Sequence, residues 1–150
     1  MSNRLFAAYG VGVNRAEMAK RCPTAKLIGA AVLRNYRLTF RGTHAAAVAN
    51  IEPAKSRSVT VLVWDITPAD EAALDLYEGF PHLYEKQQVK IRLDGMLVNC
   101  MVYVMRGDRP IGKPSAFYYS TVLEGYKAAG FDTEILKSAV QNESEEASDS

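Results

Sequence analysis

Apolar residues follow two spacings along this chain, one typical of strands and one typical of helices. Leu5 to Tyr9 is a continuous apolar run that ends in a glycine, as expected for a strand buried on both faces. Val59 to Ile66 is rich in β-branched residues and is the strongest strand candidate. We predict strands at residues 5–9, 29–40, 45–51, 59–66, 83–93 and 96–105, a polar turn at 52–57, a tight turn at Asp94-Gly95 and a loop at 106–114.

Helix start and stop signals lie beside and after these strands. Thr67 is the expected N-cap of one helix, with Asp70 as its capping-box partner, and Gly79 can adopt the left-handed conformation that ends a helix. Asn14 and Glu17 predict the start of an earlier helix in the same way. Two further helices are predicted, one from Ser115 to Gly130 and a short one capped by Asp132 that carries Ile135, Leu136, Ala139 and Val140.

The size and composition of the chain fit one folded domain. It has 150 residues, of which 48% are hydrophobic, which is enough for one well-buried core and too few for two ordinary domains. We therefore predict a single domain over residues 1–140. Residues 141–150 are polar and acidic and cannot bury enough apolar surface to order themselves, so we expect a disordered tail.

The charge balance and the metal-ligating residues exclude several classes of function. The 18 Lys and Arg nearly equal the 17 Asp and Glu, which argues against a nucleic acid or a membrane as partner and favours a small molecule. Cys22 and Cys100 lack the paired spacing of a zinc site, and we interpret both as core fillers of a reduced, cytoplasmic protein without a signal peptide. His44 and His82 have no partner at ligand spacing, so we predict no metal site.

A glycine loop links the first predicted strand to the first predicted helix. In Gly10-Val11-Gly12, the glycines allow backbone N–H groups to approach a ligand closely, and the positive end of the following helix favours a carboxylate or phosphate. A tight structural turn explains the same residues equally well. The opening resembles a dinucleotide fingerprint, but it lacks the third glycine and Cys22-Pro23 ends the helix early, so we predict no cofactor.

Glu78 stands out because a helix end is a poor place for a carboxylate. It lies in the last turn of the helix that Gly79 closes, beside unpaired carbonyl groups and the negative end of the helix dipole. A carboxylate in this position keeps its proton to a higher pH than usual. Glu78 is therefore a candidate acid and base, and the alternative is a solvated surface residue.

Four stretches together resemble the gamma-glutamylcyclotransferase-like enzymes. The order and spacing of these stretches match the pattern of the family. That pattern is Tyr-Gly-Ser-Asn, then Arg-Cys-Pro-x-Ala, then Leu-Asp-x-x-Glu-Gly with a following Tyr-x-Arg, and last Pro-Ser-x-x-Tyr. The matching stretches are Tyr9 to Gly12, Arg21 to Ala25, Leu74 to Gly79 together with the following Tyr84 to Lys86, and Pro114 to Tyr118. The resemblance covers roughly residues 4 to 132.

This resemblance implies an α+β fold, a small mixed β-barrel with peripheral helices, and a cavity that binds a gamma-glutamyl group. The residue matching the family's acid and base is Glu78, and the loop of Gly10, Val11 and Gly12 is expected to hold the glutamyl group through its backbone. The implied reaction is an intramolecular aminolysis that releases 5-oxoproline and an amine or amino acid, without a metal or cofactor. The oligomeric state is left open, with a homodimer as one option.

Three tyrosines and one departure from the family pattern bear on the substrate. Tyr9, Tyr84 and Tyr118 match family positions and are expected to contact the substrate or orient Glu78, although buried core tyrosines would give the same pattern. Val11 and Gly12 replace the family's Ser and Asn. Two alternatives to a cyclotransferase acting on gamma-glutamyl amines or amino acids therefore stay open: deprotection of a gamma-glutamylated biosynthetic intermediate, and a binding protein without catalytic activity.

Overall fold

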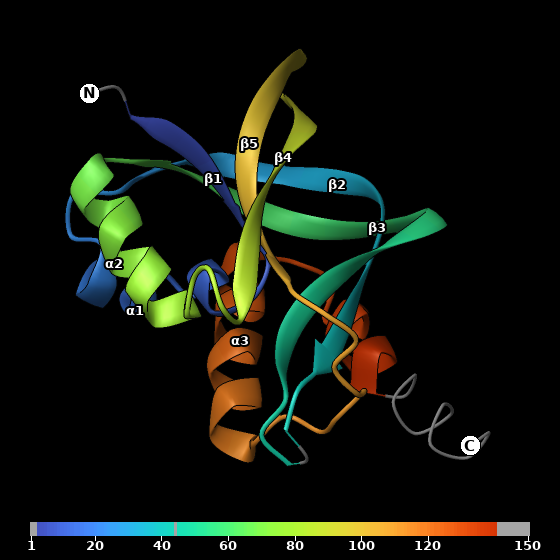
Figure 1. Ribbon diagram of the computed structural model, residues 1–150. Coiled ribbons are helices and arrows are strands. Elements are labelled where there is room, and N and C mark those ends of the chain that lie inside the picture. The colour runs from blue at the N-terminus through green and yellow to red at the C-terminus, as the bar shows by residue number, and fades with distance from the viewer. Residues whose placement is uncertain (1–2, 44, 141–150) are drawn as a thin grey trace.

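The fold is built on one curved sheet with helices on its flank. The structure is a computed structural model that describes residues 3–43 and 45–140 (Figure 1). The strands are β1 (Arg4–Ala8), β2 (Lys26–Arg41), β3 (Val48–Ile66), β4 (Tyr84–Leu93) and β5 (Met96–Met105). The helices are η1 (Val11–Val13, a 3₁₀ turn), α1 (Arg15–Arg21), α2 (Pro68–Glu78) and α3 (Ala116–Ala129), and residues 134–140 are also helical.

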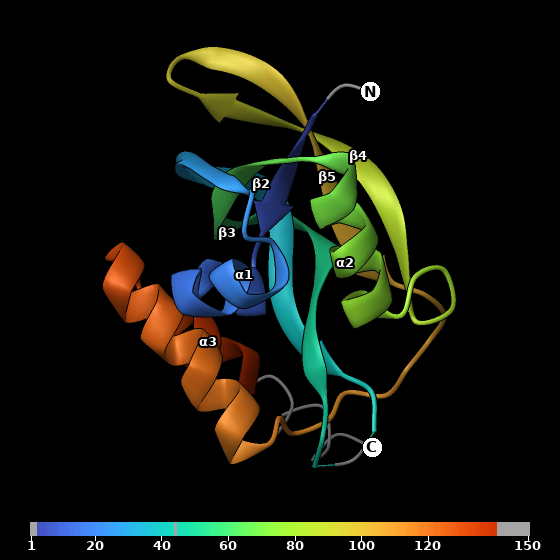
Figure 2. The same cartoon turned by 90° about the vertical axis from the view of Figure 1, so that its left-hand side faces the viewer.

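The strand order is β2-β3-β1-β5-β4, so the first strand lies at the centre of the sheet. β1 runs antiparallel to β3 and parallel to β5, where Phe6 faces Met101, which makes the sheet mixed. The helices α1, α2 and α3 gather on the side of the sheet that faces the viewer in Figure 2. The α+β class is confirmed, while β2 and β4 remain the two ends of the sheet. The predicted barrel is therefore an open, curled sheet.

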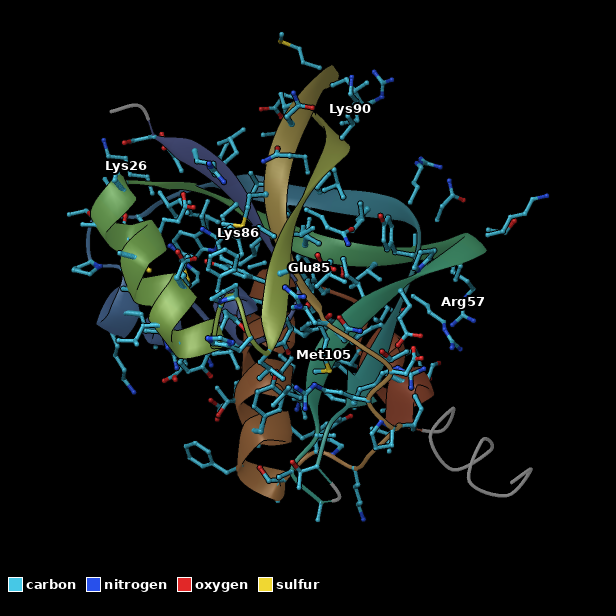
Figure 3. All side chains as sticks on the ribbon, in the orientation of Figure 1. Lys26, Arg57, Glu85, Lys86, Lys90 and Met105 are labelled. Atoms are coloured by element: carbon cyan, nitrogen blue, oxygen red, sulfur yellow. The ribbon has the colours of Figure 1, made fainter. Side chains whose placement is uncertain are left out.

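The polar turn predicted at residues 52–57 is wrong, because this segment is part of β3. β3 pairs with β2 on both sides of this segment, up to Pro53 and again from Ser58 onward, so the predicted strands 45–51 and 59–66 are two halves of this strand, which begins at Val48. Between these two parts the register changes from Arg34 opposite Ser58 to Tyr36 opposite Pro53. Asn35 and Ser56 have φ angles of 67° and 68° at this irregularity, and the Ser56 N–H donates to the Asn35 side chain at 3.3 Å. Polar residues such as Arg57 are compatible with a strand here because the ribbon projects into solvent (Figure 3).

The predicted helix caps are largely confirmed. Thr67 and Asp70 form the full capping box of α2, and Gly79 ends that helix at φ 69°. The Asn14 side chain accepts the Glu17 N–H, but the Glu17 carboxylate pairs with basic residues of α1, so this second capping box is only half formed. The α3 caps are also as predicted, Ser115 before the helix and Gly130 after it.

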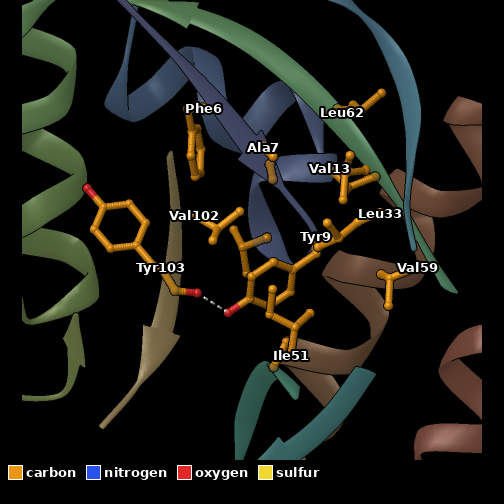
Figure 4. Close-up of a cluster of buried hydrophobic side chains, with 14 of the residues drawn as sticks. Phe6, Ala7, Tyr9, Val13, Leu33, Ile51, Val59, Leu62, Val102 and Tyr103 are labelled. Carbon is orange, nitrogen blue, oxygen red and sulfur yellow. Dashed lines mark hydrogen bonds between the residues drawn. The ribbon is translucent and has the colours of Figure 1, made fainter. Parts of the chain in front are cut away.

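The core gathers buried side chains from all five strands, and Figure 4 draws a cluster of them. The Phe6 and Tyr103 rings meet edge to face, with centroids 5.7 Å apart. Cys22 and Cys100 are buried free thiols, as expected of core fillers. None of the described helices combines the length and the apolar character that a membrane-spanning helix needs. His44 and the predicted tail 141–150 lie outside the described residues.

Candidate active site

A cavity of about 230 Å³ opens where the loop after β1 meets the ends of α2 and α3. It brings together all seven candidate site residues, Tyr9, Gly10, Val11, Gly12, Glu78, Tyr84 and Tyr118. The other lining residues are Phe6, Ala7, Ala8, Val48, Ala49, Tyr77, Leu83 and Tyr103. The lining is apolar or neutral apart from Glu78, so one carboxylate faces a mostly apolar space.

Glu78 is the last residue of α2, and the left-handed Gly79 turns the chain away directly after it. Burial raises the pKa of the Glu78 carboxyl from its ordinary 4.5 to about 7, and the nearby Arg21 charge opposes this rise. Among the described residues, its carboxylate takes part in no hydrogen bond and no ion pair within 4 Å. A carboxyl group with this pKa and no protein partner is available to exchange a proton with a bound molecule.

The glycine loop lines the same cavity as Glu78 and folds into the 3₁₀ turn η1. Val13 and Asn14 donate the hydrogen bonds of this turn, whereas no such bond to the described backbone is formed by the N–H groups of Val11 and Gly12. The Gly12 carbonyl accepts the Trp64 indole N–H at 3.0 Å. The loop therefore has two backbone donors without a protein acceptor at the cavity.

Close packing on both sides holds this loop in place. A Cβ atom on Gly12 would lie 2.7 Å from the Ala8 Cβ, and one on Gly125 of α3 would lie 2.7 Å from the Asn14 nitrogen. The Asn14 side chain also donates to the Thr121 carbonyl at 2.9 Å. Because real Cβ atoms do not approach that closely, both glycines are required for this arrangement of β1, the loop and α3.

The three predicted tyrosines use their hydroxyl groups differently. Tyr9 and Tyr84 donate to backbone carbonyls, those of Tyr103 at 2.7 Å and of Ala49 at 2.6 Å. Tyr118 instead accepts the Ala49 N–H at 3.0 Å, so its own proton remains available for another acceptor. Burial raises the pKa of all three hydroxyls, and the Glu78 charge adds to this rise. They are neutral hydrogen-bonding groups at physiological pH.

Comparison with known proteins places this site in a family. The family model described as gamma-glutamyl cyclotransferase, AIG2-like, matches residues 7–121, which is more than half of the chain. The chain belongs to this family. A comparison with curated protein sequences gave no match.

Several solved structures share the fold of this gamma-glutamyl cyclotransferase, AIG2-like family member. A protein described as gamma-glutamyl cyclotransferase has a TM-score of 0.81 and 22% identity, over 92% of this chain and 86% of that one. An uncharacterized protein from Homo sapiens has a TM-score of 0.81 and 23% identity, over 93% of this chain and 87% of that one. YkqA from Bacillus subtilis has a TM-score of 0.76 and 15% identity, over 96% of this chain and 55% of that one. At these identities the likeness concerns the fold.

Sequence reasoning missed a polar network behind the cavity of this family member. The Tyr103 hydroxyl donates to Asp75 at 2.6 Å, and Lys86 lies 2.9 Å from Asp75 and 2.6 Å from Glu71, between β4 and α2 (Figure 3). Asp75 lies one helical turn before Glu78, so the network fixes the helix that carries the candidate acid and base. Asp75 and Lys86 both belong to motifs that the sequence analysis identified, but only the fold shows that their side chains form an ion pair.

The site can bind and deprotonate a small molecule. It offers free backbone donors from the loop, the Tyr118 hydroxyl, and one carboxyl group with a pKa near neutrality. In the part of the chain that the structure describes, no three His, Cys, Asp or Glu side chains gather in an arrangement that could hold a metal ion. The chemistry within reach of these residues is therefore proton transfer combined with positioning.

Proposed function

We propose that this protein is a gamma-glutamyl cyclotransferase that releases 5-oxoproline from a gamma-glutamyl amide, with Glu78 as general acid and base. The observation that carries the proposal is the Glu78 carboxylate itself. It lies at the end of α2 in a largely apolar cavity, without a hydrogen-bond or ion-pair partner among residues 3–43 and 45–140, and burial raises its pKa to about 7. The family membership supports the same reaction class.

In the proposed reaction, the substrate amine attacks a carbonyl of the same molecule. The α-amino nitrogen forms a bond to the γ-carbonyl carbon and closes a five-membered lactam ring. Glu78 takes the proton that this nitrogen loses, and then gives it to the nitrogen of the leaving amine as the original amide C–N bond breaks. The products are 5-oxoproline and a free amine or amino acid, and no water, metal or cofactor is consumed.

The geometry supports the two tasks that such a reaction requires. A base with a pKa of about 7 is partly ionised at neutral pH, so it can accept and return a proton, an effect typically worth about 10² to 10⁴-fold. Holding the amine over the carbonyl contributes further, because intramolecular positioning saves entropy. We assign binding of the glutamyl group to the Val11 and Gly12 N–H groups and to the Tyr118 hydroxyl.

The test measures 5-oxoproline by chromatography after incubation with a panel of gamma-glutamyl amino acids and gamma-glutamyl amines. We expect product from the wild type and at least about a hundredfold less from Glu78→Gln, which keeps the shape of the side chain but cannot exchange the proton. Glu124→Gln on the exposed side of α3 is the matched control and should retain activity. The best substrate on the panel identifies the leaving group.

The two alternatives make different predictions in this test. A deprotecting enzyme would release product only from a gamma-glutamylated biosynthetic intermediate and not from simple amino-acid conjugates. A binding protein would give no product with any substrate but would still show heat of binding in calorimetry. The observation that favours a binding protein is the loop sequence Val11-Gly12. Gly12 has no side chain, so the loop can offer a ligand only backbone hydrogen-bonding groups. We propose a cytoplasmic setting, in keeping with two buried cysteines that are free thiols.

A further inference from the structure

Tyr77 borders the cavity from an unusual position. It precedes Glu78 in the last turn of α2, where helices fray, and its side chain is 46% exposed, yet it forms part of the cavity lining. A half-exposed ring at a helix end forms a stable wall only if a neighbouring group holds it in place. The structure shows such a group on another helix.

The guanidinium group of Arg21, the last residue of α1, packs on the face of the Tyr77 ring. The Arg21 Cζ atom lies 3.6 Å from the ring centroid, a distance typical of a cation–π contact. Arg21 is itself held by Glu17, since it donates to the Glu17 carbonyl at 3.1 Å and to the Glu17 carboxylate at 3.2 Å. The planar group therefore reaches Tyr77 in a fixed orientation and links the ends of α1 and α2.

Arg21 also contributes positive charge close to Glu78. The other titratable groups that line the cavity are tyrosines, namely Tyr77 of α2 itself and Tyr9, Tyr84, Tyr103 and Tyr118 of other elements. Their hydroxyls have raised pKa values and are neutral. Burial raises the pKa of Glu78 and the Arg21 charge lowers it, so the two effects oppose each other. Removing the charge would leave burial unopposed.

We propose that Arg21 is a positioning residue of this site, which holds the Tyr77 ring as the cavity wall beside Glu78 and stabilises the ionised form of the Glu78 carboxylate. The proposal rests on the function proposed above, in which ionised Glu78 is the base. It adds a role for α1, which supplies none of the side chains that line the cavity.

The experiment compares three variants with the wild type. Arg21→Met removes the charge and the planar group, Arg21→Lys keeps only the charge, and Lys20→Met is the control. Lys20 also pairs with Glu17, at 2.9 Å, but it is exposed. The readouts are the titration of the Glu78 side-chain carboxyl carbon by NMR, which needs no substrate, and the pH profiles of kcat and KM for 5-oxoproline release. Thermal unfolding of each variant checks that it is folded.

We expect Arg21→Met to move the midpoint of the Glu78 titration to higher pH by about 0.5 to 1, and to lower kcat/KM at pH 6.5 by about three- to tenfold with recovery at pH 9. Arg21→Lys should keep the midpoint but raise KM about threefold, because the ring loses the planar group that packs on it. Lys20→Met should match the wild type.

Two results separate this proposal from the proposed function. If Arg21→Met leaves the midpoint of the Glu78 titration where Lys20→Met leaves it, the role of Arg21 is refuted, whatever the activity. If the wild type releases no 5-oxoproline from any substrate, the proposed function fails, and the NMR titration still decides whether Arg21 stabilises the Glu78 carboxylate.

Discussion

The hydroxyl of Tyr118 accepts the backbone N–H of Ala49 at 3.0 Å, so a residue of α3 completes the hydrogen bonding of a strand. The carbonyl of Ala49 accepts a hydrogen bond from the Tyr84 hydroxyl at 2.6 Å. Ala49 is buried near the start of β3 and lines the cavity. Two tyrosines from distant parts of the chain therefore fix the backbone that forms one side of the site.

Tyr118→Phe should lower the free energy of unfolding by about 1 to 3 kcal/mol, because it leaves the buried Ala49 N–H without an acceptor. Urea denaturation measures this change. The matched control is Tyr119→Phe, since no hydrogen bond of the neighbouring Tyr119 hydroxyl is found within the described residues. Equal stability of the two variants would show that the Ala49 N–H is satisfied in another way.

Restoring the family asparagine at Gly12 should destabilise the protein by about 1 to 3 kcal/mol, since a Cβ there would lie 2.7 Å from the Ala8 Cβ. Neither atom can rotate away, so the backbone must shift. Combining Gly12→Asn with Ala8→Gly should recover part of the loss, and thermal unfolding of both single variants and the double variant measures the coupling. Strictly additive effects would contradict the proposed clash.

Gly125→Ala should be destabilising by about 1 to 3 kcal/mol, although alanine normally stabilises a helix relative to glycine. The added methyl would lie 2.7 Å from the Asn14 nitrogen and push α3 away from the glycine loop. Chemical denaturation checks the sign, with the exposed Glu124→Ala as control. A stabilised Gly125→Ala variant would mean that α3 and the loop are less tightly packed than described.

Glu78→Gln should stabilise the fold at alkaline pH, although it is expected to lower activity at least about a hundredfold. The pKa of Glu78 is raised from 4.5 to about 7 in the folded state, so the folded protein binds the proton more tightly than the unfolded chain. The contribution of this group to the free energy of unfolding of the wild type therefore falls as the pH rises from 4.5 to 7. Above pH 7 the buried carboxyl is ionised in the folded protein, and the full cost of burying its charge is present.

The expected gain for Glu78→Gln is near zero at pH 4.5 and about 1 to 3 kcal/mol at pH 8.5. Urea unfolding at both pH values measures it, with Glu124→Gln as the control whose stability should follow the wild type. In the wild type, activity should fall as the pH drops below 7 and Glu78 becomes protonated. A pH-independent effect of the substitution would mean that the carboxyl is not buried enough to resist ionisation.

The sequence predicted the local features of the fold better than its long-range ones. The caps at Thr67, Gly79 and Ser115 were predictable because a few adjacent residues determine them. The turn at residues 52–57 was wrongly predicted because polar composition does not distinguish a turn from a solvated two-stranded ribbon. The pairing partner decides between them, and that partner, β2, lies elsewhere in the chain.

The same distinction applies to the site. Glu78 was identifiable because its conflict with the helix end is local. The environment that raises its pKa is not local, since the surrounding tyrosines come from β4, β5, α3 and the loop after β1. Sequence spacing also gave no sign that Arg21 packs on Tyr77, because these residues meet only when α1 and α2 are brought together.

The cavity draws its lining from six stretches of chain, from β1 near the start to α3 near the end. The glycine loop and Glu78 lie before the connection between β5 and α3, and Tyr118 lies after it. A cut in the exposed segment 106–110 should therefore yield two pieces that each lack the proposed activity, which would return only when they reassociate. If the proposed function holds, the release of 5-oxoproline thus also reports that the whole chain is assembled.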